Sequence, residues 1–245
     1  KLLIPVENID LIDRYVADGS SYAVVDKLGK GSFAKLKEKV KDRLFAIAND
    51  IIKLAAAREL VNGIKINTEK KLLEDFPKSA GFDYTKDQKR SIKEIFADLS
   101  SGRVMDRLLS GDVGFGKTEV AMNAMLAVVL DGFQALFICP TTLLASQHFH
   151  GIQKRFSEFG IKVAKLDGKT SAKEKTSIKK ALENGDIQIV IGTHSLLSVK
   201  TKDLALVIID EEHKFGVKQK EKLKQLREDV HIFSMSATPI PRTLN

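Results

Sequence analysis

Two short strings carry the residues from which we infer chemistry. Residues 111–118 read Gly-Asp-Val-Gly-Phe-Gly-Lys-Thr and match G-x-x-x-x-G-K-[ST], a pattern typical of loops that wrap nucleotide phosphates. Glycines let such a loop bend so that successive N–H groups point at phosphate oxygens. Lys117 would supply positive charge, and the Thr118 hydroxyl would bind Mg²⁺. We therefore expect an ATP site made by Gly111, Asp112, Val113, Gly114, Phe115, Gly116, Lys117, Thr118 and Glu119.

The second string follows the apolar run Leu204–Ile209, which is typical of a buried parallel strand. Asp210 and Glu211 come directly after it, at the strand end where open α/β sheets place their ligands. Asp210 would hold Mg²⁺ together with Thr118, and Glu211 would deprotonate the water that attacks the terminal phosphate. An acidic pair after a strand also occurs in solvated turns. The phosphate-loop string upstream favours the catalytic interpretation of Lys117, Asp210 and Glu211.

The elements that would position these residues alternate between strands and helices from about Ser79 onward. Strands are predicted at Arg107–Ser110, Ala135–Cys139, Val163–Leu166, Ile187–Ile191, Leu204–Ile209 and His231–Met235. Helices are predicted at Lys86–Leu99, Thr118–Leu130, Leu143–Phe159 and Ser171–Asn184. This alternation predicts an α/β fold with a doubly wound parallel sheet.

The composition of the chain favours some classes of protein over others. The chain has 245 residues, 43% of them hydrophobic, which is enough for one α/β domain and a smaller part. No apolar run approaches the ~20 residues of a membrane span, and the single cysteine, Cys139, excludes an internal disulfide, so we expect a cytoplasmic protein. The five histidines have neither cysteine partners nor zinc-type spacing, which argues against a structural metal site. The net charge of +8 suits a polyanionic partner.

The first part of the chain has a different character. Residues 1–25 hold too little apolar sequence for a core and are expected to be the end of a preceding domain. Within 26–78, apolar residues recur every three or four positions between Ser32 and Asn62, which predicts one long amphipathic helix that Gly63 would stop. Residues 79–245 would form the α/β lobe. Because the chain begins at Lys1 and ends just past a Pro-rich run, we expect it to be a piece of a longer protein.

Further polar residues stand next to the predicted helices and strands. Phe82 could stack on an adenine ring and the amide of Gln88 could read its edge, although Gln88 also suits the first turn of a helix. Small polar residues follow several strands and suit contacts with a sugar–phosphate backbone, although each also suits a helix cap or a turn. These are Thr141, Thr142, Gln147, Thr193, His194, Ser236 and Thr238.

Together these strings resemble superfamily 2 helicases and translocases over residues 80–245, which implies a RecA-like fold. The resemblance implies that Phe82 and Gln88 read adenine and that Asp210 and Glu211 serve Mg²⁺ and water. It also implies that residues 140–147 and 192–195 touch DNA. His213, Ser236 and Thr238 would couple the nucleotide state to the grip on DNA.

Two branches of that superfamily compete. RecG-type fork-reversal helicases share the Gly-Asp-Val-Gly loop. Phe115, Glu119 and the string Asp-Glu-Glu-His at 210–213 are more similar to the transcription-repair coupling factors, as are residues 1–62. One departure is Leu166–Lys169, which lacks the Arg-Phe usual in that branch. This resemblance implies a double-stranded DNA translocase that displaces stalled RNA polymerase, contacted at its β subunit by the domain ending at residue 25. It also implies partners from nucleotide excision repair.

A hypothesis of another class is a non-catalytic interaction module ordered by nucleotide. Glu211 argues against it, because binding requires Mg²⁺ ligands but no base that activates water. In motors of the resembling superfamily the arginine finger comes from a second lobe. We therefore expect residues 1–245 alone to show almost no DNA-stimulated ATP hydrolysis.

Overall fold

The structure is a computed structural model that describes residues 35–46, 49, 61–211, 214–215 and 229–237. Two compact units are present, residues 1–54 and 55–245, and each is considered by itself. In the first unit residues 35–46 form a helix with exposed side chains, in agreement with the helical spacing. Most of the remaining predicted long helix, residues 1–25, His213 and Thr238 lie outside the described residues. No helix among the described residues is both long and apolar enough to span a membrane.

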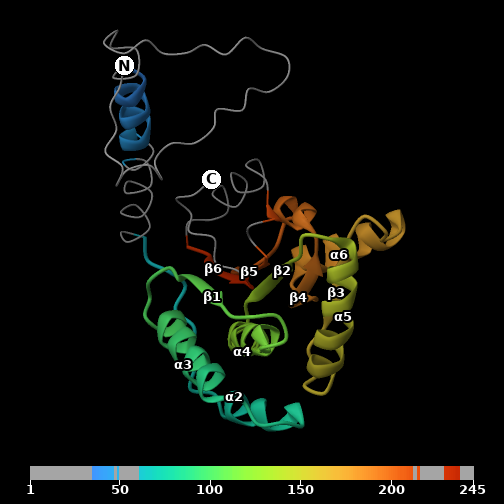
Figure 1. The fold of residues 1–245 in the computed structure, drawn as a ribbon. Coiled ribbons are helices and arrows are strands. Elements are labelled where there is room, and N and C mark those ends of the chain that lie inside the picture. The colour runs from blue at the N-terminus through green and yellow to red at the C-terminus, as the bar shows by residue number, and fades with distance from the viewer. Residues whose placement is uncertain (1–34, 47–48, 50–60, 212–213, 216–228, 238–245) are drawn as a thin grey trace. The chain divides into compact units, whose positions relative to one another are not determined.

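A six-stranded parallel sheet organises the second unit (Figure 1). The strand order is β1-β6-β5-β2-β4-β3, and each neighbouring pair runs parallel. The strands are β1 Asp106–Ser110, β2 Gln134–Ile138, β3 Val163–Leu166, β4 Ile189–Gly192, β5 Leu204–Asp210 and β6 His231–Ser236. This arrangement confirms the predicted doubly wound parallel sheet, and the strand bounds lie within two residues of those predicted.

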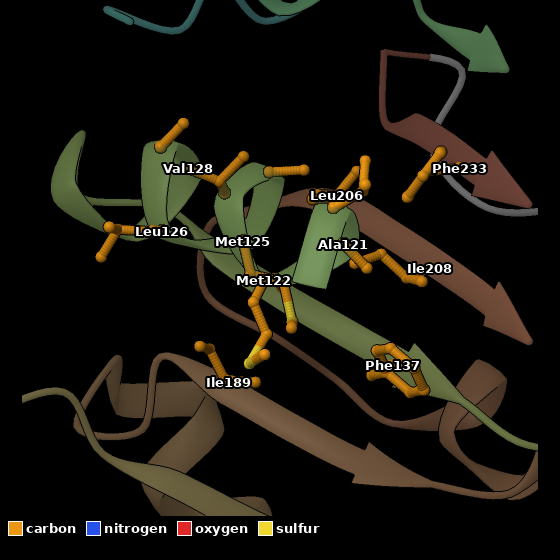
Figure 2. Close-up of a cluster of buried hydrophobic side chains, with 14 of the residues drawn as sticks. Ala121, Met122, Met125, Leu126, Val128, Phe137, Ile189, Leu206, Ile208 and Phe233 are labelled. Carbon is orange, nitrogen blue, oxygen red and sulfur yellow. The ribbon is translucent and has the colours of Figure 1, made fainter. Parts of the chain in front are cut away.

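Alternate residues of the central strands belong to two separate hydrophobic cores, one on each face of the sheet. On one face, Phe137 of β2 belongs to a core with residues of α2 (Lys71–Asp75), α3 (Lys86–Ser100), α4 (Lys117–Leu130) and α5 (Thr142–Ser157). On the other face, Leu136 and Ile138 belong to a core with residues of α6 (Ala172–Asn184) and η3 (His194–Ser198). Figure 2 shows α4 side chains, including Ala121 and Met122, gathered over strand residues such as Ile208. Because both faces are covered, the strands read as continuous apolar runs rather than as alternating ones.

The helices that cover the sheet have local sequence signals at their ends. They are α2 Lys71–Asp75, η2 Pro77–Ala80, α3 Lys86–Ser100, α4 Lys117–Leu130, α5 Thr142–Ser157, α6 Ala172–Asn184 and η3 His194–Ser198. The side chains of Thr85, Thr141 and Ser171 cap α3, α5 and α6, and Gly185 ends α6 in a left-handed conformation. The short elements α2, η2 and η3 were not predicted, because so few residues establish no periodicity.

A strap formed by residues 62–70 lies against the α/β unit. Gly63 donates its N–H to the carbonyl of Gly102 at 2.9 Å, and a Cβ at Gly63 would overlap the backbone of Arg103. The amide of Ile66 donates to the carbonyl of Leu99 at 2.9 Å, and the Lys70 ammonium binds Asp131 at 2.8 Å. Gly63 was predicted only as a helix stop. The structure gives a different requirement for glycine at this position, the close approach to residue 103.

His231 joins this strap to the sheet. It is fully buried, its Nδ1 accepts from the N–H of Met105 at 3.0 Å, and its Nε2 lies 2.7 Å from the carbonyl of Ile64. These partners require a neutral ring with the proton on Nε2. Burial lowers the pKa of His231, against the smaller opposing effects of the Ile64 hydrogen bond and the charges of Asp229 and Asp98.

We therefore expect acid to destabilise the α/β unit through His231. A lowered folded-state pKa means that the unfolded chain binds more protons, so stability falls as pH drops through about 6.5 toward the folded-state value. The slope from one such group is at most about 1.4 kcal/mol per pH unit. Urea unfolding between pH 8 and pH 5 measures it. In His231→Phe, which cannot titrate, the slope should be shallower, and an unchanged slope would contradict this assignment.

Candidate functional site

Three neighbouring strands bring the two predicted strings together at the carboxyl ends of the strands. β6 pairs with β1 on one side and with β5 on the other, so Ser110 and Asp210 both end beside the end of β6. The N–H of Gly111 donates to the carbonyl of Ser236 at 3.2 Å, and the N–H of Glu211 donates to that of Met235 at 2.9 Å. The loop at 111–116 and the acidic pair therefore flank the carboxyl end of β6.

The loop is wound around the side chain of its own lysine. Gly114 and Gly116 have φ values of 85° and 72°, in the left-handed region that favours glycine, and Gly116 precedes the first residue of α4. The Lys117 ammonium donates to the carbonyls of Gly111 and Asp112 at 2.5 and 2.9 Å. The loop thus gathers a cation, backbone N–H groups and the N-terminus of a buried helix, an arrangement suited to an anion.

Gln88 has the structural role that its position in a helix suggests and a second contact as well. Its Oε1 accepts from the N–H of Thr85 at 2.9 Å, and the Thr85 hydroxyl accepts from the N–H of Gln88, which completes a capping box. Its Nε2 donates to the carbonyl of Phe115 at 2.9 Å. A Cβ at Gly116 would overlap this amide. Gln88 therefore fixes the loop to the start of α3, while adenine reading by Gln88 remains a prediction.

A hollow of about 470 Å³ lies beside Phe82. Its lining combines an aromatic ring with basic and acidic side chains and comprises Pro77, Lys78, Gly81, Phe82, Asp83, Tyr84 and Lys89. The Phe82 ring is 54% exposed and lies 5.8 Å from the ring of Tyr84, centroid to centroid. An exposed ring at the rim of a hollow is suited to stacking on a base.

Sequence reasoning missed a buried polar network behind this hollow. The Tyr84 hydroxyl donates to Glu119 at 2.7 Å and accepts from the Nδ2 of Asn123 at 3.1 Å. Arg155 of α5 approaches the same carboxylate at 3.4 Å, donates to the carbonyl of Phe76 at 3.1 Å and lies over the Phe76 ring. Burial, and then the bond to Glu119, raise the pKa of Tyr84 to about 12. The carboxylate of Glu119, predicted as a nucleotide contact, thus ties α4 to α5 and to residues 76–84.

The acidic pair lies across from α5. Asp210 is buried, and one carboxylate oxygen is 3.0 Å from Nε2 of His148. Glu211 has a φ of 54°, the only positive φ of a non-glycine among the described residues. Such strain costs about 1–3 kcal/mol and gathers at functional sites, so it supports a role for Glu211 beyond a solvated turn.

A second hollow, of about 310 Å³, lies between α4 and α5. Both helices contribute to its lining, which comprises Thr118, Glu119, Met122, Gln147, His148, Gly151, Ile152 and Arg155. Thr118 and His148, the partner of Asp210, therefore border the same space, while the Mg²⁺ site shared by Thr118 and Asp210 remains a prediction. No ion-pair or spacing rule in the sequence pointed to His148.

Some of the residues predicted to contact the DNA backbone are bonded within the protein, and others are exposed. The Thr141 hydroxyl caps α5 by accepting from the N–H of Leu144 at 3.2 Å, and Thr193 is buried with its hydroxyl 3.4 Å from that of Ser195. Gln147 and His194 are exposed, and Thr142 is partly exposed, at the same edge of the sheet. Ser236 is buried and bonded to the loop through its carbonyl. Contact with DNA remains a prediction for all of these residues.

Residues 85–245 match the family model described as DEAD/DEAH box helicase. The whole chain is 58% identical over 245 residues to the transcription-repair-coupling factor of Helicobacter pylori (strain J99 / ATCC 700824). It is 44% identical over 247 residues to the factor of Bacillus subtilis (strain 168). The chain spans only 24% and 21% of the length of these two relatives. The similarity to transcription-repair coupling factors inferred from the motifs is thereby confirmed.

A solved structure of RecG bound to a three-way DNA junction shares this fold. It superposes with a TM-score of 0.71 at 43% identity and covers 86% of this chain and 29% of that one. The predicted RecA-like architecture is confirmed by this likeness together with the strand order.

The buried network yields a prediction about stability. Tyr84→Phe removes a hydroxyl that donates to Glu119 and accepts from Asn123, and the loss of a hydrogen bond to a charged group costs about 1.5–3 kcal/mol. Chemical unfolding should show a loss in that range. Asp83→Asn, at the exposed neighbouring position, should change stability by no more than about 0.5 kcal/mol. Equal effects of the two substitutions would show that the network does not stabilise the unit.

Proposed function

Because the chain belongs to the DEAD/DEAH box helicase family, we propose that it forms the first motor lobe of an ATP-dependent double-stranded DNA translocase. The observation that carries this proposal is the convergence of the phosphate-type loop, Asp210 and Glu211 around the end of β6. A lobe that only bound nucleotide would need the loop and the Mg²⁺ ligand. It would not need a second, strained carboxylate beside them.

Each residue contributes a separate property to the proposed reaction. Lys117 already lies inside the loop, where its charge would offset that of the terminal phosphates. Thr118 and Asp210 offer the hydroxyl and carboxylate oxygens that Mg²⁺ prefers. When bound, the ion would supply charge neutralisation at the phosphates. Glu211 would accept the proton of the attacking water, and Phe82 would hold the adenine at the 470 Å³ hollow.

The larger role follows from similarity along the full chain. The match to coupling factors includes residues 1–62, which lie before the helicase family match. We therefore propose that the protein of which this chain is a part displaces stalled RNA polymerase and connects transcription to nucleotide excision repair. Thr142, Gln147 and His194 would approach the DNA backbone, whose recognition needs polar contacts but no sequence readout.

Lys117→Ala should abolish measurable binding of Mg·ADP while the chain stays folded. The lysine bonds only loop carbonyls, so the cost in stability should stay below about 1.5 kcal/mol. Isothermal calorimetry and thermal unfolding measure the two effects. Lys173→Ala, on the exposed side of α6, serves as the matched loss of charge and should bind like the parent. Normal affinity in Lys117→Ala would refute the loop assignment.

Glu211→Gln should retain Mg·ATP binding in the longer protein yet slow its hydrolysis by about 100-fold or more, because a carboxamide cannot accept the proton. Steady-state hydrolysis with duplex DNA measures the rate, and fluorescence of a labelled nucleotide measures binding. The expected separation is between rate and affinity. Turnover near that of the parent would move the base to another residue.

A further inference from the structure

A cysteine, a histidine and an aspartate from three separate elements meet near the proposed nucleotide site. The ligand atoms of Cys139, His148 and Asp210 all lie within 4.8 Å of one another. We propose that these three side chains form a binding site for a borderline-soft divalent metal such as Zn²⁺, which shares Asp210 with the proposed Mg²⁺ site but adds Cys139 and His148 as ligands. Metal binding would place the motor lobe under inhibitory control.

The fold explains why residues distant in sequence converge. Cys139 directly follows β2 and Asp210 ends β5, and the pairing of Ile138 with Ile209 makes them neighbours across the sheet edge. The N–H of Cys139 donates to the carbonyl of Gly192 at 2.8 Å, which fixes its backbone. The helix α5 places His148 next to Cys139 and Asp210. The ring of His148 lies 4.9 Å from that of Phe137, centroid to centroid.

The ligand set favours zinc-type ions over magnesium. Zn²⁺ takes thiolate sulfur, imidazole nitrogen and carboxylate oxygen at about 2.0–2.3 Å, so its ligand atoms lie about 3.5 Å apart. The Nε2 of His148 and a carboxylate oxygen of Asp210 are already 3.0 Å apart. If the Cys139 sulfur lies at the upper limit of 4.8 Å from these two atoms, a shift of about 1 Å would bring it to the separation that zinc ligands require. Sulfur ligands are unsuited to Mg²⁺, which prefers oxygen.

An ion could reach the site through the 310 Å³ hollow between α4 and α5. His148 lines that hollow together with Thr118 and Gln147. Three protein ligands leave the fourth tetrahedral position open to a water molecule, as in zinc sites that are not closed structural ones. Asp210 and His148 are buried or partly buried, so the donor set is held in place before an ion arrives.

Binding would change the state of the cysteine. Burial, and then the negative charge of Asp210, raise the pKa of Cys139, so the free group is a protonated thiol. A metal–sulfur bond forms as the S–H bond breaks, and the proton passes to water. The ion would also hold the carboxylate of Asp210, which would then be less available to Mg²⁺. This last consequence rests on the proposed function, whereas the metal site does not.

Cobalt binding to the 245-residue chain tests the site directly. Cys139 is the only cysteine in the chain, so a sulfur-to-cobalt charge-transfer band on titration with Co²⁺ can come from no other thiol. We expect this band, intense visible absorption typical of tetrahedral cobalt, and displacement of both by Zn²⁺. Cys139→Ala should lose the charge-transfer band. His150→Ala, an exposed histidine on the same helix, should keep all three signals.

Affinity and nucleotide binding complete the test. Loss of the ligand in Cys139→Ala or His148→Ala should weaken Zn²⁺ binding by more than the roughly 10–100-fold that an outer-shell partner contributes. Zn²⁺ should also weaken Mg·ADP binding in the parent but not in Cys139→Ala. A parent chain without the sulfur band, or variants with unchanged Zn²⁺ affinity, would overturn the metal site. A sulfur band without any effect on Mg·ADP would retain the site and refute its link to the nucleotide.

Discussion

The burial of α4 is the constraint on which the rest of the α/β unit depends. Residues Val120–Val128 are all buried between the sheet and the neighbouring helices, so the helix cannot shift without opening the core. Only a short loop separates its first residue, Lys117, from the end of β1. The loop is therefore confined at both ends. Its left-handed glycines and its lysine need supply only the last local geometry, because packing has already fixed where an anion would meet the helix N-terminus.

Most of the fold could be predicted from the sequence, because strands buried on both faces are continuous apolar runs and the helices between them begin with capping residues. The loop and the acidic pair could also be predicted, since each is a local string at a strand end. The two side-chain clusters could not. Glu119 and Arg155 are 36 positions apart and His148 and Asp210 are 62 apart, and only the path of α5 brings either pair together. The histidine spacing that argued against a metal motif carried no information about this convergence.

Gln88 and Tyr84 each combine a structural role near α3 with a contact to a distant part of the chain. Gln88 is a capping residue, as its position in the chain suggests, and its remaining amide group holds the loop at Phe115. Tyr84 is buried, yet its hydroxyl links the hollow beside Phe82 to Glu119 of α4. The proposed adenine side and the proposed phosphate side are thus connected through protein bonds. A shift of residues 82–88 would be felt by the loop even where no side chain touches both.

The strap at residues 62–70 has a mechanical consequence. Its bonds are spread over four places: the end of α3 through Leu99, the turn before β1 through Gly102, the end of α4 through Asp131, and β6 through His231. Tension applied to the chain at Asn62 would therefore be divided among several bonds rather than borne by one. Two of those anchors adjoin β1 and β6, the strands that end at the phosphate-type loop and at Ser236. A pull on the segment before the strap would therefore be transmitted through these bonds to the two strands that end beside the loop.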